Sequence, residues 1–137
     1  MTDPDQLTAL RDAMPFAREL GIEVLEASPA VVRARLDHRP ELCTGGGILH
    51  GGALMALADS SGALCAFLNL PEGAAGTGTI ESKTNFLRAV SDGAVTAESR
   101  PLHAGRTTVV VETTLARADG KLAAKVTQTQ AVHYPRS

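Results

Sequence analysis

The sequence predicts an α+β fold in which one curved antiparallel sheet wraps around a single long helix. A long, strongly apolar segment with helical spacing starts near Ile48, with two strand-like segments before it and four after it. The connections between the strands are short, as in antiparallel sheets. The 137 residues contain no linker, repeat or low-complexity tract, so we expect residues 1–137 to form one domain.

The first third of the chain contains a short helical segment and two strands. Apolar residues recur at helical spacing within residues 1–20: Leu7, Leu10, Met14 and Ala17. Pro15 predicts a break in this N-terminal helical segment. Residues 21–27 and 30–38 alternate like strands and meet at Ser28-Pro29. Residues 39–47 end in three consecutive glycines and therefore predict a loop.

The central segment, "ILHGGALMALADSSGALC", predicts a helix that is apolar on nearly all sides, as buried helices normally are. Its only carboxylate is Asp59, which lies on a face of small residues. Because an ionised carboxylate is costly to bury without partners, this residue needs an explanation. Either Asp59 has a functional role, or it caps a second helix that begins after a break at "DSSGA".

Four strand-like segments follow, at residues 79–90, 94–102, 107–118 and 121–134. Asp92-Gly93, "HAGR" and Asp119-Gly120 separate them, and Asp-Gly between alternating segments is a strong hairpin signal. This pattern predicts an antiparallel meander. A curved antiparallel sheet around one long helix is the hotdog fold, which is the fold class we expect.

Composition excludes several classes of function. The net charge is −2, no basic block occurs, Trp is absent and only four aromatic residues are present, all of which argues against nucleic acid. Cys43 and Cys65 match no metal or disulfide spacing, so we expect no metal and a reducing, cytoplasmic setting. Acidic residues come before any apolar run in residues 1–14, so we expect no secretory signal. Residues 48–70 hold too many polar groups for us to expect a membrane span.

The residues "HGGALMALAD", followed by "TIESKTNFLRAVSDGAVTAESRPLHAGRTTVVVETTLARADGKLAAKVTQ", resemble the hotdog-fold acyl-CoA thioesterases of the PaaI-like (phenylacetic acid degradation thioesterase) group. The similarity runs from about Met14 to His133. It implies that Asp59 is the general base or nucleophile, that the Gly51 N–H polarises the thioester carbonyl, and that the Thr79 hydroxyl orients water or the acid. It implies no cofactor, since coenzyme A is part of the substrate. Six residues before His50, many members of the group carry Asn or Gln, whereas this chain has Thr44.

The glycines at the start of the helix suit an oxyanion site independently of the resemblance. The first N–H groups of a helix lack internal partners, and the helix dipole is positive there. The alternative is that Gly51 and Gly52 simply end the loop. Asp59 lies eight residues further on, about 12 Å along the axis. One thioester cannot contact both groups on one helix, so we expect a site shared across a homodimer, or a tetramer built as a dimer of dimers.

Other candidate residues have simpler readings. His50 is either an orienting group or a proton donor, and the alternative for Thr79 is a strand former without a role in the site. Four basic residues are candidates for the phosphates of coenzyme A, unless they lie on a solvated strand face: Lys83, Arg88, Arg100 and, as first choice, Arg106.

The function we expect is hydrolysis of a small or aromatic acyl-CoA to the free acid and coenzyme A. Two alternatives remain open at this point. One is a hotdog hydratase or dehydratase in which His50 and Asp59 transfer a proton. The other is a non-catalytic module that binds acyl-CoA.

Overall fold

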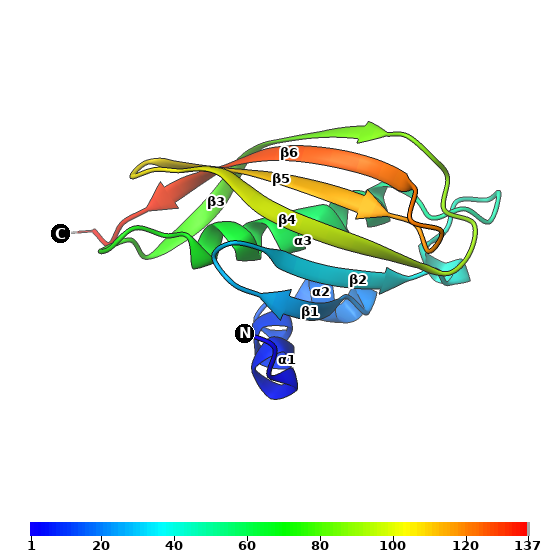
Figure 1. Cartoon of the computed structure of the whole chain (residues 1–137), viewed down its shortest axis with the longest axis horizontal. Coiled ribbons are helices and arrows are strands. Elements are labelled where there is room, and N and C mark those ends of the chain that lie inside the picture. Colours follow the sequence, from blue (N-terminus) through cyan, green and yellow to red (C-terminus); the bar gives the residue numbers. More distant parts are fainter. Residues whose placement is uncertain (137) are drawn as a thin grey trace.

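The computed structural model describes residues 1–136 and shows a six-stranded antiparallel sheet curved over one long helix, α3 (Gly51–Leu68) (Figure 1). The predicted fold class is therefore confirmed. Two short helices, α1 (Pro4–Asp12) and α2 (Pro15–Leu20), precede the first strand, and the break between them falls at Ala13 and Met14, directly before Pro15, as expected. The remaining elements are strands β1 (Glu23–Ala27), β2 (Val32–Asp37), β3 (Gly76–Phe86), β4 (Ala94–Ala104), β5 (Thr108–Ala116) and β6 (Leu122–His133), and a single 3-10 turn, η1 (Pro40–Leu42).

The strand order, β1-β2-β4-β5-β6-β3, differs from the predicted meander. β3 pairs with β6 rather than with β4, so the Asp92-Gly93 turn is not a hairpin. Instead the Gly93 carbonyl accepts a hydrogen bond from the His38 N–H at 2.8 Å, which ties the start of β4 to the end of β2. The other two turns do form hairpins, β4–β5 and β5–β6. The turn residues predicted a hairpin at all three places, because they do not reveal which strand the following segment will pair with. Only the tertiary pairing of the strands separates a hairpin from a connection to a different strand.

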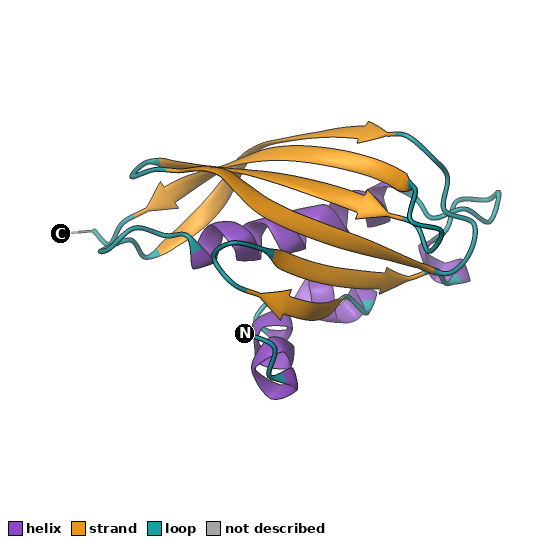
Figure 2. Cartoon of the chain, in the orientation of Figure 1, coloured by secondary structure: helices purple, strands orange, loops and turns teal. Residues whose placement is uncertain are grey.

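Helix α3 fills the concave side of the sheet (Figure 2). Its buried side packs against the sheet through fully buried Leu57, Ala58 and Cys65. The core also contains a chain of hydroxyls, in which Ser61 Oγ lies 2.8 Å from Ser99 Oγ and Ser99 Oγ lies 2.7 Å from Thr113 Oγ1. Buried polar groups need such partners, and these three satisfy one another.

The expectation that α3 is buried on nearly all sides is wrong for the single chain. Met55, Asp59 and Phe67 are exposed on α3, and Asp59 lies toward the open edge of the sheet, at β3. The helix is continuous through Asp59, so this residue does not cap a second helix. By length and composition α3 could cross a membrane, but 44% of it is buried in the domain and it is the core helix of the sheet.

Candidate active site

Asp59 lies in an open hollow of about 360 Å³ between the exposed side of α3 and the edge strand β3. The hollow is lined by Gly52, Met55, Ala56, Thr79 and Ser82. Asp59 is therefore accessible to a small molecule. The structure brings together Asp59 and Thr79, two of the residues expected at the site.

One oxygen of the Asp59 carboxylate accepts two hydrogen bonds. Thr79 Oγ1 donates to Asp59 Oδ1 at 3.1 Å, and Gln128 Nε2 donates to the same oxygen at 2.9 Å. Thr79 in turn accepts a hydrogen bond at its Oγ1, donated by Gln130 Nε2 at 2.6 Å. Asp59 Oδ2 accepts no hydrogen bond from any residue in the described range, 1–136. The carboxylate is thus held by one oxygen and presents the other.

A bulge in β3 sets the side chains that face Asp59. The register between β3 and β6 shifts between Thr79, which pairs with Gln130, and Glu81, which pairs with Thr129. The shift places Thr79 and Ser82 in the hollow and leaves Glu81 out of its lining. Bulges near functional sites commonly redirect side chains in this way. Here the bulge keeps a second carboxylate away from Asp59.

The start of α3 is capped by His50. Its backbone is extended (φ −60°, ψ 137°), and its Nδ1 accepts the Gly52 N–H at 2.8 Å. Ala53 donates to the His50 carbonyl at 2.9 Å. Within the described residues the Gly51 N–H has no acceptor, so it is the free donor of this helix terminus. Gly52 lines the Asp59 hollow but its own N–H is already used.

Gly51 opens into a different hollow, also of about 360 Å³, together with Thr44 and Arg88. Its wall is mostly apolar, formed by Ile48, Leu49, Leu54, Phe86, Leu87, Ala89 and Val90. The Phe86 ring lies over Gly51, since a Cβ built on this glycine would be 3.0 Å from Phe86 Cζ. The Thr44 hydroxyl accepts the Gly46 N–H at 3.3 Å and so is part of a loop turn. Within one chain, Gly51 and Asp59 therefore face separate spaces.

The basic candidates are scattered. Arg88 lines the Gly51 hollow, although one of its nitrogens donates to the Leu122 carbonyl at 3.0 Å. Lys83 is exposed on β3, and Arg100 pairs with Glu98 at 2.9 Å. Arg106 lies in the β4–β5 turn. Lys83, Arg100 and Arg106 line neither of the two hollows.

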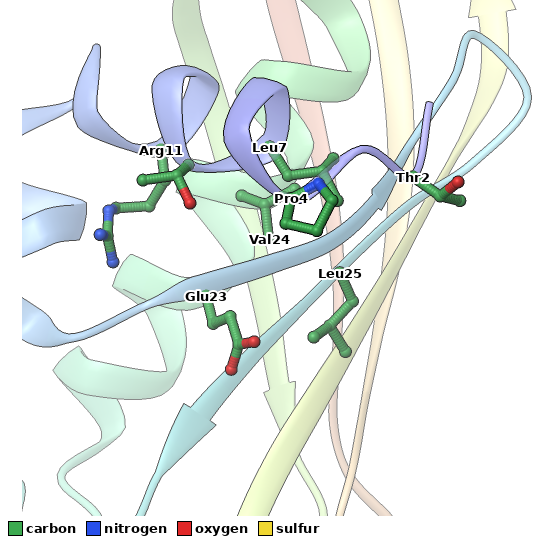
Figure 3. Close-up of a pocket in the computed structure, with 8 residues that line it drawn as sticks. Thr2, Pro4, Leu7, Arg11, Glu23, Val24 and Leu25 are labelled. Atoms are coloured by element: carbon green, nitrogen blue, oxygen red, sulfur yellow. The ribbon is translucent and has the colours of Figure 1, made fainter.

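A third hollow, of about 240 Å³, lies between α1 and β1 (Figure 3). Its lining includes Leu7, Arg11 and Glu23. Arg11 is already engaged, donating to the Ile22 carbonyl at 2.8 Å and to Asp12 Oδ1 at 2.7 Å. This hollow contains none of the residues expected to act on a thioester.

The two cysteines do not form a reactive centre. Cys65 is fully buried in the core, and burial raises the pKa of its thiol to about 11. Cys43 Sγ lies 3.2 Å from His38 Nε2, but the same nitrogen is 2.8 Å from the Gly47 carbonyl and so donates its proton there. No group of three or more His, Cys, Asp or Glu residues able to hold a metal occurs within residues 1–136.

Sequence reasoning missed Gln128 and Gln130. Two features of the sequence could have indicated them: polar residues at alternating positions of a strand, and a glycine inside a long helix. Both occupy inward positions of β6, where the alternation otherwise predicts apolar residues, and both are 1% exposed. In addition, a Cβ on Gly62 would lie 1.9 Å from Gln128 Oε1, and a glycine inside a long helix often has such a packing reason.

Comparisons with known proteins agree with this fold. Residues 46–124 match the family described as the thioesterase superfamily. In sequence, the chain is 38% identical over 106 residues to "Putative esterase Rv1847" of Mycobacterium tuberculosis, covering 75% of each chain. It is 40% identical over 88 residues to the proofreading thioesterase EntH of Cronobacter sakazakii, covering 64% of this chain and 58% of the relative.

Solved structures superpose over almost the whole chain. A variant of thioesterase PA1618 from Pseudomonas aeruginosa matches with a TM-score of 0.88 and 31% identity, over 97% of this chain and 95% of that one. Thioesterase HI1161 from Haemophilus influenzae matches with a TM-score of 0.87 and 28% identity, over 93% and 90%. The chain therefore belongs to the thioesterase superfamily, has its hotdog fold, and is a thioester hydrolase.

Proposed function

We propose that this thioester hydrolase is a cytoplasmic acyl-CoA thioesterase of the PaaI-like group, which cleaves small or aromatic acyl-CoA esters without a cofactor. The observation that carries the proposal is the Asp59 carboxylate, which is held through Oδ1 by Thr79 and Gln128 and faces an open hollow through Oδ2. A fixed carboxylate with one free oxygen suits either proton removal from water or direct attack.

In the general-base form of the reaction, Asp59 Oδ2 takes a proton from water while the water oxygen bonds to the thioester carbon. The C–S bond then breaks, and the proton passes to the departing thiolate to give coenzyme A and the free acid. In the nucleophilic form, Asp59 Oδ2 attacks the thioester carbon and the C–S bond breaks, which releases coenzyme A as a thiolate and leaves a mixed anhydride. Water then hydrolyses the anhydride to the free acid and the Asp59 carboxylate, and the proton released goes to the thiolate. In both forms the free Gly51 N–H stabilises the developing oxyanion, an interaction worth about 3 kcal/mol per donor.

We further propose that the active unit is a dimer that shares each site between two subunits. The exposed surface around the site is apolar: Met55 is 41% exposed, Ile80 64% and Phe86 54%. β3 is an 11-residue edge strand, and a long exposed edge invites pairing with another chain. A two-fold axis beside α3 and β3 brings the same surface of a second copy against it. Gly51 of one subunit then faces Asp59 of the other across one shared site, although the two residues line separate hollows within a single chain.

The function is tested by following thiol release from a panel of CoA thioesters. We expect Asp59→Asn to lower kcat by about 10²-fold or more, since general-base catalysis contributes about 10² to 10⁴. Ser60→Ala, at the neighbouring position on α3, is the matched control and should retain activity. Equal rates for wild type and Asp59→Asn would refute the role of Asp59. Hydration of an enoyl-CoA without thiol release would favour a hydratase, and tight binding without turnover would favour a binding module.

The shared site is tested by mixing two inactive variants. Gly51→Pro removes the N–H at the first position of α3, where the helix backbone tolerates proline, and the extended backbone of His50 suits a residue before proline. The exposed Phe86 ring must shift by a few tenths of an ångström to admit the added Cβ. After subunit exchange with Asp59→Asn, half of the dimers are mixed and each carries one intact site. We expect recovery of about a quarter of wild-type activity. If mixed dimers form without recovery, each site belongs to a single subunit.

A further inference from the structure

The hydrogen bonds around Asp59 form a directed chain that begins on β6. Gln130 Nε2 donates to Thr79 Oγ1 at 2.6 Å, and the Thr79 hydroxyl donates to Asp59 Oδ1 at 3.1 Å. A threonine hydroxyl has one proton, and here its oxygen already accepts a bond from the amide. Its proton is therefore directed to the carboxylate. The Thr79 hydroxyl orients the acid rather than a water molecule.

Gln128 reaches the same oxygen by a second, independent route. Its Nε2 donates to Asp59 Oδ1 at 2.9 Å, and its side chain is 1% exposed. The amide is wedged against α3 at Gly62, where any Cβ would lie 1.9 Å from Gln128 Oε1. That oxygen is buried and accepts no hydrogen bond from the described residues, so packing rather than polar pairing holds the amide in place. The fit leaves Gln128 little freedom to turn away from Asp59.

These two routes hold one carboxylate oxygen and leave the other free. A carboxylate that turns freely presents an oxygen to the reacting atom only part of the time, and misplacement by about 1 Å can cost about 10²-fold in rate. Donors on Oδ1 fix the plane of the carboxylate and point Oδ2 into the hollow. Hydrogen bonds to a charged acceptor are also the stronger ones.

We propose that Gln128 and Gln130 are positioning residues of the hydrolysis: Gln128 holds Asp59 Oδ1 directly, Gln130 holds it through Thr79, and Oδ2 is the reacting oxygen. The inference rests on the proposed role of Asp59. In this arrangement Gln130 acts on Asp59 only through Thr79, whereas Gln128 acts on it directly. Removing Thr79 should therefore abolish the effect of Gln130 on kcat but not that of Gln128, a difference that a merely structural role would not produce.

A double-mutant cycle on kcat tests this arrangement. We expect Gln128→Met to lower kcat by about tenfold or more, with KM changed by less than about twofold. Gln130→Met should lower kcat by about three- to tenfold in the wild-type background. In the Thr79→Val background, adding Gln130→Met should change kcat by less than about twofold, whereas adding Gln128→Met should still lower it by about tenfold.

Thr113→Val is the matched control, because this buried hydroxyl bonds to Ser99 and has no contact with Asp59. It should lower thermal stability without lowering kcat. An equal loss from Gln130→Met in both backgrounds, or a rise in KM with unchanged kcat in Gln128→Met, would overturn the inference while leaving thioester hydrolysis intact. If Gln128→Met does not fold, the Gln130 comparison decides alone. A wild type that releases no thiol from the panel would refute the proposed function, and the inference with it.

Discussion

Replacing Gly62 with alanine perturbs the site without touching any group that meets substrate. In an ordinary helix interior this change is stabilising by about 1 kcal/mol, because alanine is the better helix former. Here the added Cβ would lie 1.9 Å from Gln128 Oε1 and 2.6 Å from its Cδ, closer than any real contact. Gln128 must therefore move, and its hydrogen bond to Asp59 must break.

The magnitude follows from three opposing terms. Overpacking a buried position costs about 1–3 kcal/mol. Losing the hydrogen bond to the charged Asp59 adds about 1 kcal/mol, less than is usual for a charged acceptor because water reaches this exposed carboxylate. The helix propensity of alanine returns about 1 kcal/mol. The free energy of unfolding should therefore fall by about 1–3 kcal/mol, and kcat should fall by about tenfold as Asp59 loses Gln128.

Urea unfolding at one fixed protein concentration measures the first quantity, since an oligomer's stability depends on concentration. Thiol release measures the second. Ser60→Ala controls for helix propensity, and Gly62→Ala combined with Gln128→Ala should lose less stability than the sum of the single changes. The double variant should not regain activity. If Gly62→Ala is stabilised by about 1 kcal/mol and keeps full kcat, Gln128 does not hold Asp59.

Three further outcomes follow from the structure. Native protein should react with a thiol reagent at Cys43 only, and at both cysteines after unfolding, because burial raises the pKa of Cys65 to about 11. The Arg33 guanidinium, 2.9 Å away, lowers the pKa of Glu98, so this pair stabilises the fold above the pKa of an unfolded glutamate and loses its effect as pH falls through the lower folded pKa. Urea midpoints of Glu98→Gln should therefore depend less on pH in the acid range, and by a small, salt-sensitive amount. Leu57→Ala, at a fully buried position, should lower the free energy of unfolding by about 2–5 kcal/mol.

Much of the architecture is readable from local patterns. The break at Pro15, the two first strands and the long apolar helix all follow from spacing and from turn residues, and all three are present. The position of Cys65 on the buried side of α3 also follows from the helical period. The pairing of β3 with β6 does not, because a turn such as Asp92-Gly93 carries no information about which distant strand completes the sheet edge.

The sequence alone determined the α+β hotdog class, because the long apolar helix and the alternating strands that define it are patterns of residues close together in the chain. Only the tertiary structure decided what surrounds Asp59. Gln128 lies 69 positions away along the chain and Gln130 lies 51 away from Thr79, so no local pattern relates them. The fold brings them together through the register of β6 against β3, the bulge at Ile80 and the missing side chain of Gly62. The helix that first looked wholly buried is open on the side of Asp59, since one sheet covers only one side of a helix.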